Sequence, residues 1–303
     1  MESSAVRADL HDPATLASLG HLEVIARWVV DGFLSGLHRS PRKGFSVEFA
    51  DFRPYQPGDD LRYVDWKIAA RSDRWVVKQY EEETNLRATI ILDVSASMDW
   101  RGAPAAERLT KRTYGEQLAA ALALLLLRQR DAVGLIRFDD AVRTSVPPRA
   151  RTSQWRRLVA ALMEPSGGRA SDAPTALAQA ARLVTRRGMV IFISDLLVDV
   201  DATLSALRGL RAAGHDVTVL HVMDPAERSF LLSGEARYAD PESDLVVPAG
   251  ADVRAVYDRT VETVIAEWRS ALGAMGARYE VVLTDQPYAT PLRRVFDARQ
   301  RQP

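Results

Sequence analysis

Carboxylate and hydroxyl side chains follow two predicted strands at the points where those strands end. One apolar strand ends in Asp93, which is followed at alternate positions by Ser95 and Ser97. Because side chains in extended chain alternate with a period of two, these three residues can point the same way. A later apolar strand ends in Asp195. Sites in open α/β sheets lie beyond the carboxyl ends of the strands, so we expect both acids at one surface edge of the sheet.

A polar loop between these strands offers a further hydroxyl. It contains two glycines followed by Ser171 and Asp172, and it precedes a predicted helix. Two acids and several hydroxyls make an oxygen-only site, which suits Mg²⁺ or Mn²⁺. The spacing leaves a second interpretation open, in which Asp93, Ser95 and Ser97 only cap the turn after the strand.

The composition excludes several other chemistries. The chain has no cysteine, so disulfides, thiolate catalysis, iron–sulfur clusters and cysteine zinc sites are excluded. The five histidines show no paired ligand spacing and suggest no Ser–His–Asp arrangement, and the phosphate-binding G-x-x-x-x-G-K-[ST] motif is missing. Lys plus Arg and Asp plus Glu both number 40, and this zero net charge argues against a nucleic-acid binder.

Hydropathy indicates a cytoplasmic protein without a membrane span. The longest apolar run, Leu118 to Leu127, has ten residues, whereas a spanning helix needs about 20. The N-terminal segment lacks the apolar core of a signal peptide.

Apolar segments alternating with amphipathic ones predict an α/β fold with a mostly parallel sheet covered by helices on both faces. The predicted strands are 87–93, 132–138, 188–195, 215–221 and 278–283, with 141–146 as a hairpin partner of the second. The predicted helices are 12–36, 107–128, 154–163, 176–187, 201–213 and 252–273.

Three parts of the chain differ in pattern: an N-terminal tail and amphipathic helix (1–38), a small irregular and partly β subdomain (39–85), and the sheet domain (86–298). The middle part interleaves acids and bases with aromatic residues: Asp51, Asp59, Asp60, Asp65, Arg53, Arg62, Lys67 and Arg71 with Phe49, Phe52, Tyr55 and Trp66. We favour an ion-pair and stacking network that holds this irregular subdomain onto the sheet domain. A direct binding surface is the alternative.

The strand-end residues resemble the metal-ion-dependent adhesion site of the von Willebrand factor A fold. The resemblance implies a Rossmann-like sheet and a Mg²⁺ held by Asp93, Ser95, Ser97, a loop hydroxyl and a final acid. Ser171 matches the loop position, with Thr175 as a competing candidate, and Asp195 matches the final acid. In that fold an acidic residue of a partner protein completes the metal shell.

A longer segment resembles the bacterial family catalogued as domain of unknown function fifty-eight. It runs from Gly44 to Arg71 through Asp51-Phe-Arg-Pro and Asp65-Trp-Lys, and Lys78-Gln-Tyr-Glu follows it. Members combine this segment with an A-type domain, and they are often encoded beside MoxR-type AAA+ ATPases. Many members begin with two membrane helices. This sequence shows no such helices, so it resembles the shorter, soluble branch of the family.

We therefore expect a non-catalytic, metal-dependent interaction protein that acts with a MoxR-type AAA+ ATPase in the assembly or maturation of a client. The alternative is a Mg²⁺-dependent phosphatase or phosphotransferase with Asp93 as nucleophile. Haloacid-dehalogenase-type enzymes place a second Asp two residues after the nucleophile as the general acid–base, but Ser95 occupies that position here.

Overall fold

The computed structural model describes residues 22–38, 52–56, 64, 66–72, 75–78, 86–102, 108–151, 153–165, 173–229, 236–239, 246–249 and 254–299. The chain divides into two compact units, and each is described by itself. The larger unit comprises Met1–Ser35 and Leu86–Pro303, and the smaller unit comprises Gly36–Asn85.

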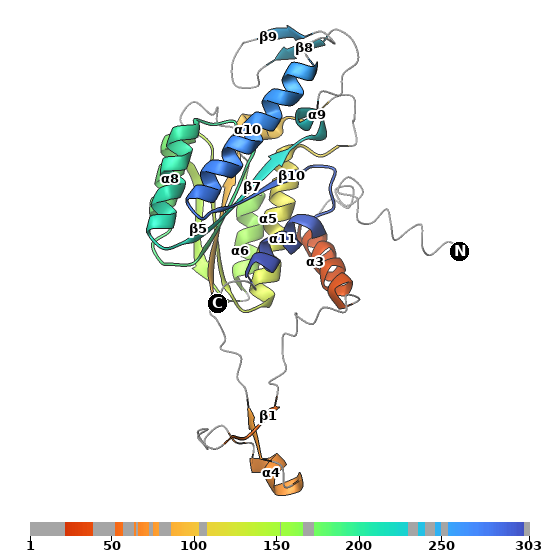
Figure 1. Ribbon diagram of the computed structural model, residues 1–303, viewed down its shortest axis with the longest axis vertical. Helices are drawn as coiled ribbons and strands as arrows, with labels where there is room; N and C mark the ends of the chain where they lie inside the picture. The colour runs from red at the N-terminus through yellow and green to blue at the C-terminus, as the bar shows by residue number, and fades with distance from the viewer. Residues whose placement is uncertain are drawn as a thin grey trace, which may run out of the picture. The chain divides into compact units, whose positions relative to one another are not determined.

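The larger unit is built on a six-stranded sheet flanked by helices (Figure 1). The strand order is β10-β7-β6-β3-β4-β5. Its strands are β3 (Arg87–Asp93), β4 (Ala132–Phe138), β5 (Val142–Arg149), β6 (Met189–Ser194), β7 (Asp216–Met223) and β10 (Arg278–Leu283). All neighbours pair in parallel except β4 and β5, which form an antiparallel hairpin at one edge. The predicted α/β class with a mostly parallel sheet is confirmed.

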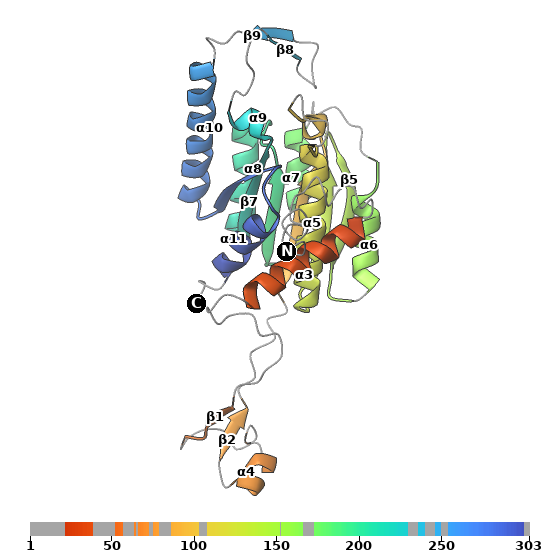
Figure 2. The same cartoon turned by 90° about the vertical axis from the view of Figure 1, so that its right-hand side faces the viewer.

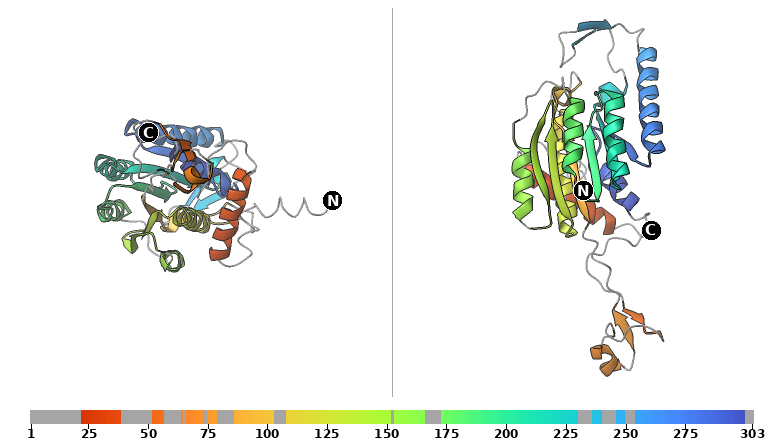
Figure 3. Two further views of the ribbon diagram at one scale, coloured as in Figure 1. Left: turned by 90° about the horizontal axis from the view of Figure 1, so that it is seen from below. Right: turned by 90° about the vertical axis from the view of Figure 1, so that its left-hand side faces the viewer.

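Helices cover both faces of the sheet. They are α3 (Leu22–His38), α5 (Lys111–Arg128), α6 (Ser153–Leu162), α7 (Ala173–Leu183), α8 (Val200–Ala212), α9 (Pro225–Arg228), α10 (Arg254–Ala274) and α11 (Ala289–Arg299). Figure 2 shows α3, α5, α6 and α11 on the face turned to the viewer. The opposite face carries α7, α8 and α10 (Figure 3), whose apolar side chains share one buried core with strands β3, β4, β6 and β7.

The central strands and helix α5 are apolar because they are surrounded by other parts of the protein. Every residue of β6 is buried, and so are six of the seven residues of β3. In α5 the buried residues run almost without interruption from Gln117 to Leu126, as the continuous apolar run in the sequence indicates. The stretch that is too short to span a membrane is therefore the central core helix.

Several element boundaries differ from the sequence predictions by one to four residues, and three of these differences have a local physical reason. Helix α5 begins at Lys111 instead of Glu107, because the Thr110 side chain accepts a hydrogen bond from the Thr113 N–H (3.1 Å) and caps the helix there. Helix α7 begins three residues earlier than predicted, and Pro174 in its first turn is compatible with a helix start. Strand β5 runs to residue 149 through two prolines, which an edge strand tolerates.

The smaller unit contains a two-stranded antiparallel pair, β1 (Phe52–Pro54) and β2 (Val76–Lys78), and helix α4 (Trp66–Ser72). The Tyr55 N–H donates to the Trp75 carbonyl (2.9 Å), and the Trp75 ring lies 5.7 Å from the rings of both Tyr55 and Trp66. Asp51, Asp65 and the side chain of Arg53 lie outside the described residues, so the ion-pair network stays a prediction.

Two further features complete the described part of the chain. A backbone hairpin, β8 (Ala236–Ala239) with β9 (Val246–Ala249), lies between α9 and α10 in the sequence, where no strand was predicted. Among the described residues, no helix combines the length and the apolar character needed to cross a lipid bilayer.

Candidate functional site

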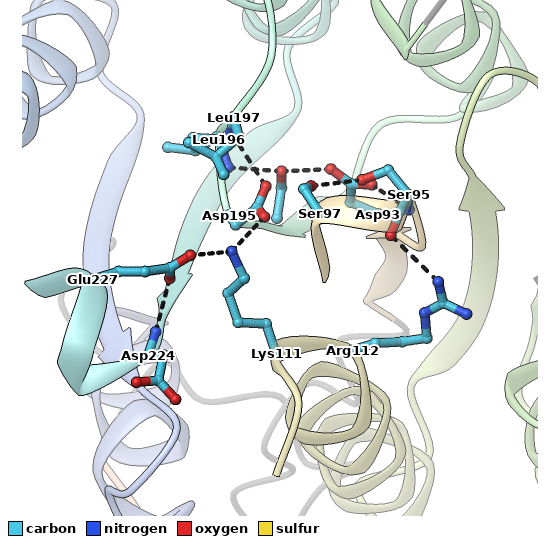
Figure 4. Close-up of polar contacts among 11 residues, drawn as sticks. Asp93, Ser95, Ser97, Lys111, Arg112, Asp195, Leu196, Leu197, Asp224 and Glu227 are labelled. Carbon is cyan, nitrogen blue, oxygen red and sulfur yellow. Dashed lines mark hydrogen bonds and ion pairs between the residues drawn. The ribbon is translucent and has the colours of Figure 1, made fainter. Parts of the chain in front are cut away.

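Four of the five predicted metal ligands lie where the strand order reverses. Strand β3 pairs with β4 on one side and with β6 on the other, and the chain proceeds from β3 to β4 but from β6 to β7. This switch point is the usual place for a site in an open α/β sheet. Asp93 ends β3, Asp195 directly follows β6, and both project into the same region with Ser95 and Ser97 (Figure 4).

These four side chains are buried. Asp93 is fully covered, and the exposed fractions of Ser95, Ser97 and Asp195 are 1%, 2% and 2%. They lie at the carboxyl ends of the strands, as expected, but none of the four side chains is exposed.

Both carboxylate oxygens of Asp93 are fixed by hydrogen bonds. Oδ1 accepts from the Ser95 backbone N–H (2.9 Å), and Oδ2 accepts from the Ser194 hydroxyl (2.7 Å). The Ser194 oxygen in turn accepts from the Leu196 N–H (3.0 Å). Burial, and next the negative charge of Asp195, raise the pKa of Asp93 to about 6. The cost of ionising Asp93 shows that a nearby positive charge would stabilise this carboxylate.

Ser95 and Ser97 face each other instead of capping the turn. Ser95 is the N-cap of the short helical turn Ala96–Asp99, yet its side chain makes no capping hydrogen bond. Its Oγ lies 3.1 Å from the Oγ of Ser97. The capping interpretation therefore fails for the Ser95 hydroxyl, whereas Asp93 does accept a backbone N–H of the turn.

The loop hydroxyl remains a prediction. Ser171 and Asp172 lie outside the described residues. Thr175, the competing candidate, is exposed on α7 and lines a groove between α7 and α8 together with Gln179 and Ser205.

Sequence reasoning missed a buried lysine beside Asp195. The Nζ of Lys111, at the start of α5, lies 2.8 Å from Oδ2 of Asp195 and 2.5 Å from Oε1 of Glu227. Lys111 has no exposed side-chain surface. Burial lowers the pKa of Lys111, but the carboxylates of Asp195 and Glu227 outweigh it and raise that pKa above its ordinary value. Lys111 is therefore a charged ammonium.

Glu227 is held by a capping box at the start of α9. The Asp224 N–H donates to Glu227 Oε2 (3.0 Å), and the Asp224 side chain caps the same helix by accepting from the Ala226 N–H (2.8 Å). The Tyr257 hydroxyl of α10 donates to the Glu227 carbonyl (2.9 Å). Lys111 thus joins the end of β6 to the segment that follows β7.

A second base supports the turn after β3. Arg112 donates to the Ser95 carbonyl (3.3 Å) and pairs with Asp99 (2.5 Å). These contacts stabilise the turn without involving the Asp93 carboxylate, which accepts its hydrogen bonds from Ser95 and Ser194.

The donor set fits a hard divalent cation. Two hydroxyl oxygens lie 3.1 Å apart beside a buried carboxylate, and oxygen donors of this kind suit Mg²⁺ or Mn²⁺. Within the described ranges, no Lys or Arg pairs with Asp93, and no group of three or more His, Asp or Glu side chains has metal-binding spacing. The site would therefore depend on hydroxyls and water as much as on carboxylates.

Comparison with known proteins identifies relatives along almost the whole chain. The family model described as "Protein of unknown function DUF58" matches residues 51–267. Relatives include Uncharacterized protein Rv1480 of Mycobacterium tuberculosis and Uncharacterized protein Mb1516 of Mycobacterium bovis. Each is 30% identical over 98% of this chain and 94% of its own length.

Solved structures give weaker likenesses. An aerotolerance-related membrane protein from Bacteroides fragilis (16% identity) and BatB from Bacteroides thetaiotaomicron (15% identity) each match 72% of this chain and 100% of their own, with TM-scores of 0.48 and 0.44. The vWF domain of the pilus tip protein Mfa5 from Porphyromonas gingivalis matches with 12% identity, 72% and 97% coverage and a TM-score of 0.33. These TM-scores are low, so the assignment of a von Willebrand factor A-like fold rests on the chain's own strand order and on its antiparallel edge hairpin.

Proposed function

Because the chain belongs to the DUF58 family, we propose that it is a non-catalytic interaction protein that binds Mg²⁺ or Mn²⁺ at its strand-end site and presents that cation to an acidic side chain of a partner. The observation that carries this proposal is the pair of hydroxyls of Ser95 and Ser97, 3.1 Å apart beside the buried Asp93. Asp93, Ser95 and Ser97 would hold the cation from one side. Asp195 and the hydroxyl of Ser171 would hold it from the other.

The arrangement of the site favours binding over catalysis. The residue two positions after Asp93 is a serine whose hydroxyl pairs with Ser97, so it offers no carboxyl group for proton transfer. The nearby Lys111 is held between two carboxylates. A cation bound by few carboxylates keeps residual positive charge, which attracts a further carboxylate.

The partner that we propose is a MoxR-type AAA+ ATPase or its client protein in the cytoplasm. The resemblance of the segment Gly44–Arg71 to proteins encoded beside such ATPases supports this choice. One ionic contact cannot fix a protein complex alone, so surrounding apolar and polar contacts must supply most of the affinity.

Calorimetric titration with Mg²⁺ and Mn²⁺ tests the metal site. Asp93→Asn removes the charge and keeps the shape, and we expect it to weaken binding by roughly tenfold or more. Ser205→Ala, which removes an exposed serine of α8, is the matched control and should bind as the unmodified protein does. Equal affinity in Asp93→Asn and the unmodified protein would overturn the metal assignment.

Two further assays separate interaction from catalysis. A pull-down with the purified ATPase should succeed in Mg²⁺ and fail in EDTA or with Asp93→Asn. Binding that ignores both changes would place the contact on another surface. Turnover of a generic phosphate ester that needs Mg²⁺ and is lost in Asp93→Asn would establish the phosphatase alternative instead.

A further inference from the structure

Lys111 is an unusual basic residue for this chain. The protein has 36 arginines and four lysines, and the other three lysines are Lys43, Lys67 and Lys78. Lys111 is therefore the only lysine in residues 86–303. A lysine ammonium is a compact point charge, whereas a guanidinium is a wide planar fork. The compact ammonium of Lys111 lies between the carboxylates of Asp195 and Glu227.

The position of Lys111 in α5 is electrostatically unfavourable by itself. It is the first residue of the helix, where the helix dipole disfavours positive charge. Its side chain is also fully buried, which penalises a charge further. The two carboxylates offset these costs, together with the Trp100 ring, whose centroid lies 5.8 Å from the Lys111 Nζ. The ammonium is therefore stabilised by the strand-end site and not by the helix.

Glu227 keeps the ammonium in place. One of its oxygens accepts from Lys111 and the other accepts from the Asp224 N–H, so the carboxylate is anchored to α9. Asp195 is anchored in the same way, because its Oδ1 accepts from the Leu197 N–H (3.2 Å) while Oδ2 receives Lys111. Both partners of the lysine therefore have one oxygen fixed by backbone and one devoted to the ammonium.

We propose that Lys111 is a built-in competitor of the divalent cation, which occupies Asp195 and keeps the metal affinity of the site low until a partner supplies another carboxylate. This inference rests on the proposed function. A metal ion at Asp93, Ser95 and Ser97 is repelled by the ammonium and shares Asp195 with it. A partner's Asp or Glu adds the negative charge that Lys111 cancels, so metal and partner bind more tightly together than separately.

The decisive comparison uses two variants that differ only at position 111. Lys111→Met/Glu227→Gln removes the ammonium together with one of its carboxylates, so that the buried charge stays balanced and Asp195 is free. Glu227→Gln alone keeps the ammonium on Asp195. In calorimetric Mg²⁺ titration, we expect the double variant to bind roughly tenfold more tightly than Glu227→Gln. Equal affinity in the two variants would overturn the proposal.

The same titration separates this inference from the proposed function. If the unmodified protein binds Mg²⁺ and the two variants bind it equally, the function stands and the role of Lys111 is wrong. If only the double variant binds Mg²⁺, Lys111 replaces the metal in the native protein, and the metal-dependent function is wrong. If no form binds Mg²⁺ or Mn²⁺, both are wrong.

A measurement on the native side chain covers the case in which the double variant does not fold. Replacing Lys43, Lys67 and Lys78 by arginine leaves Lys111 as the single lysine, whose labelled Cε gives one NMR signal. We expect this signal to shift during Mg²⁺ titration with the dissociation constant found by calorimetry. A signal that stays fixed while calorimetry shows binding would overturn the competition between lysine and metal.

Discussion

The hydroxyl of Ser194, the last residue of β6, donates to Oδ2 of Asp93, the last residue of β3, over 2.7 Å. This bond joins the ends of two neighbouring strands and fixes the orientation of a buried carboxylate. The Ser194 oxygen also accepts from the backbone N–H of Leu196, so it positions the chain that carries Asp195. The site is therefore set by a side chain that is not itself among the proposed ligands.

Ser194→Ala should lower both stability and metal affinity. The change leaves Asp93 Oδ2 without its buried donor, which costs about 1–3 kcal/mol of unfolding free energy. Urea unfolding measures this loss, and calorimetry with Mg²⁺ measures the weaker binding. Ser205→Ala, at an exposed position of α8, should change unfolding by less than about 0.5 kcal/mol. A Ser194→Ala effect no larger than that of the control would contradict the structural role.

Lys111→Met alone should destabilise the protein in EDTA. It leaves the two facing carboxylates of Asp195 and Glu227 without their shared cation, and breaking a buried pair in this way costs about 3–5 kcal/mol. The double variant with Glu227→Gln should recover much of that loss, because one of the two unpaired charges is removed.

A surface pair provides the control for this loss. Arg254 and Asp258 lie 3.8 Å apart with side chains 59% and 38% exposed. Arg254→Met should therefore cost no more than about 0.5 kcal/mol in urea unfolding. If Lys111→Met costs as little as Arg254→Met, the buried pair does not stabilise the fold.

The strand-end site was predictable because its signal is local. Asp93, Ser95 and Ser97 share a short segment, and the apolar runs before Asp93 and Asp195 identify both as strand ends. The carboxyl ends of parallel strands meet at one edge of a sheet, so convergence followed from general rules.

The contacts of Lys111 were not predictable because they are long-range. Its partners lie 84 and 116 residues away in sequence, and a lysine in a predicted helix is ordinarily a solvated residue. One local signal was present: Asp224-Pro225-Ala226-Glu227 has the pattern of a capping box with proline at the first helical position. That pattern indicates the short helix α9, but it does not show which residue its glutamate meets.

Two glycines with opposite surroundings test the packing of the sheet and of α8. A Cβ at Gly134 in β4 would lie 2.7 Å from the Val146 carbonyl oxygen and 2.8 Å from Pro148, whereas a Cβ at Gly209 in α8 meets nothing within 4 Å. Gly134→Ala should therefore destabilise the protein by about 1–3 kcal/mol through overpacking. Gly209→Ala should stabilise it by about 0.5–1 kcal/mol, because alanine favours a helix interior. Thermal unfolding of both variants measures the difference, and equal effects would contradict the pairing of β4 with β5.

Glu116 on α5 predicts a pH dependence of stability. Burial raises the pKa of Glu116 to about 7, although the positive charges of Arg137 and Arg112 act in the opposite direction. Between the ordinary value of 4.5 and about 7, the folded protein keeps this proton while the unfolded chain has released it. The folded state then binds more protons, so the free energy of unfolding falls as pH rises through this range.

Glu116→Gln should remove that fall. The amide cannot ionise, so above pH 7 the variant should be more stable than the unmodified protein, by up to roughly 3 kcal/mol, with little difference near pH 4.5. Urea unfolding in steps from pH 4.5 to 8 measures both curves, and Glu267→Gln on the exposed side of α10 controls for the loss of one acidic charge. The opposite result, a variant that is less stable above pH 7, would show that the ion pair of Glu116 with Arg137, 3.7 Å apart, outweighs the cost of burying the carboxylate.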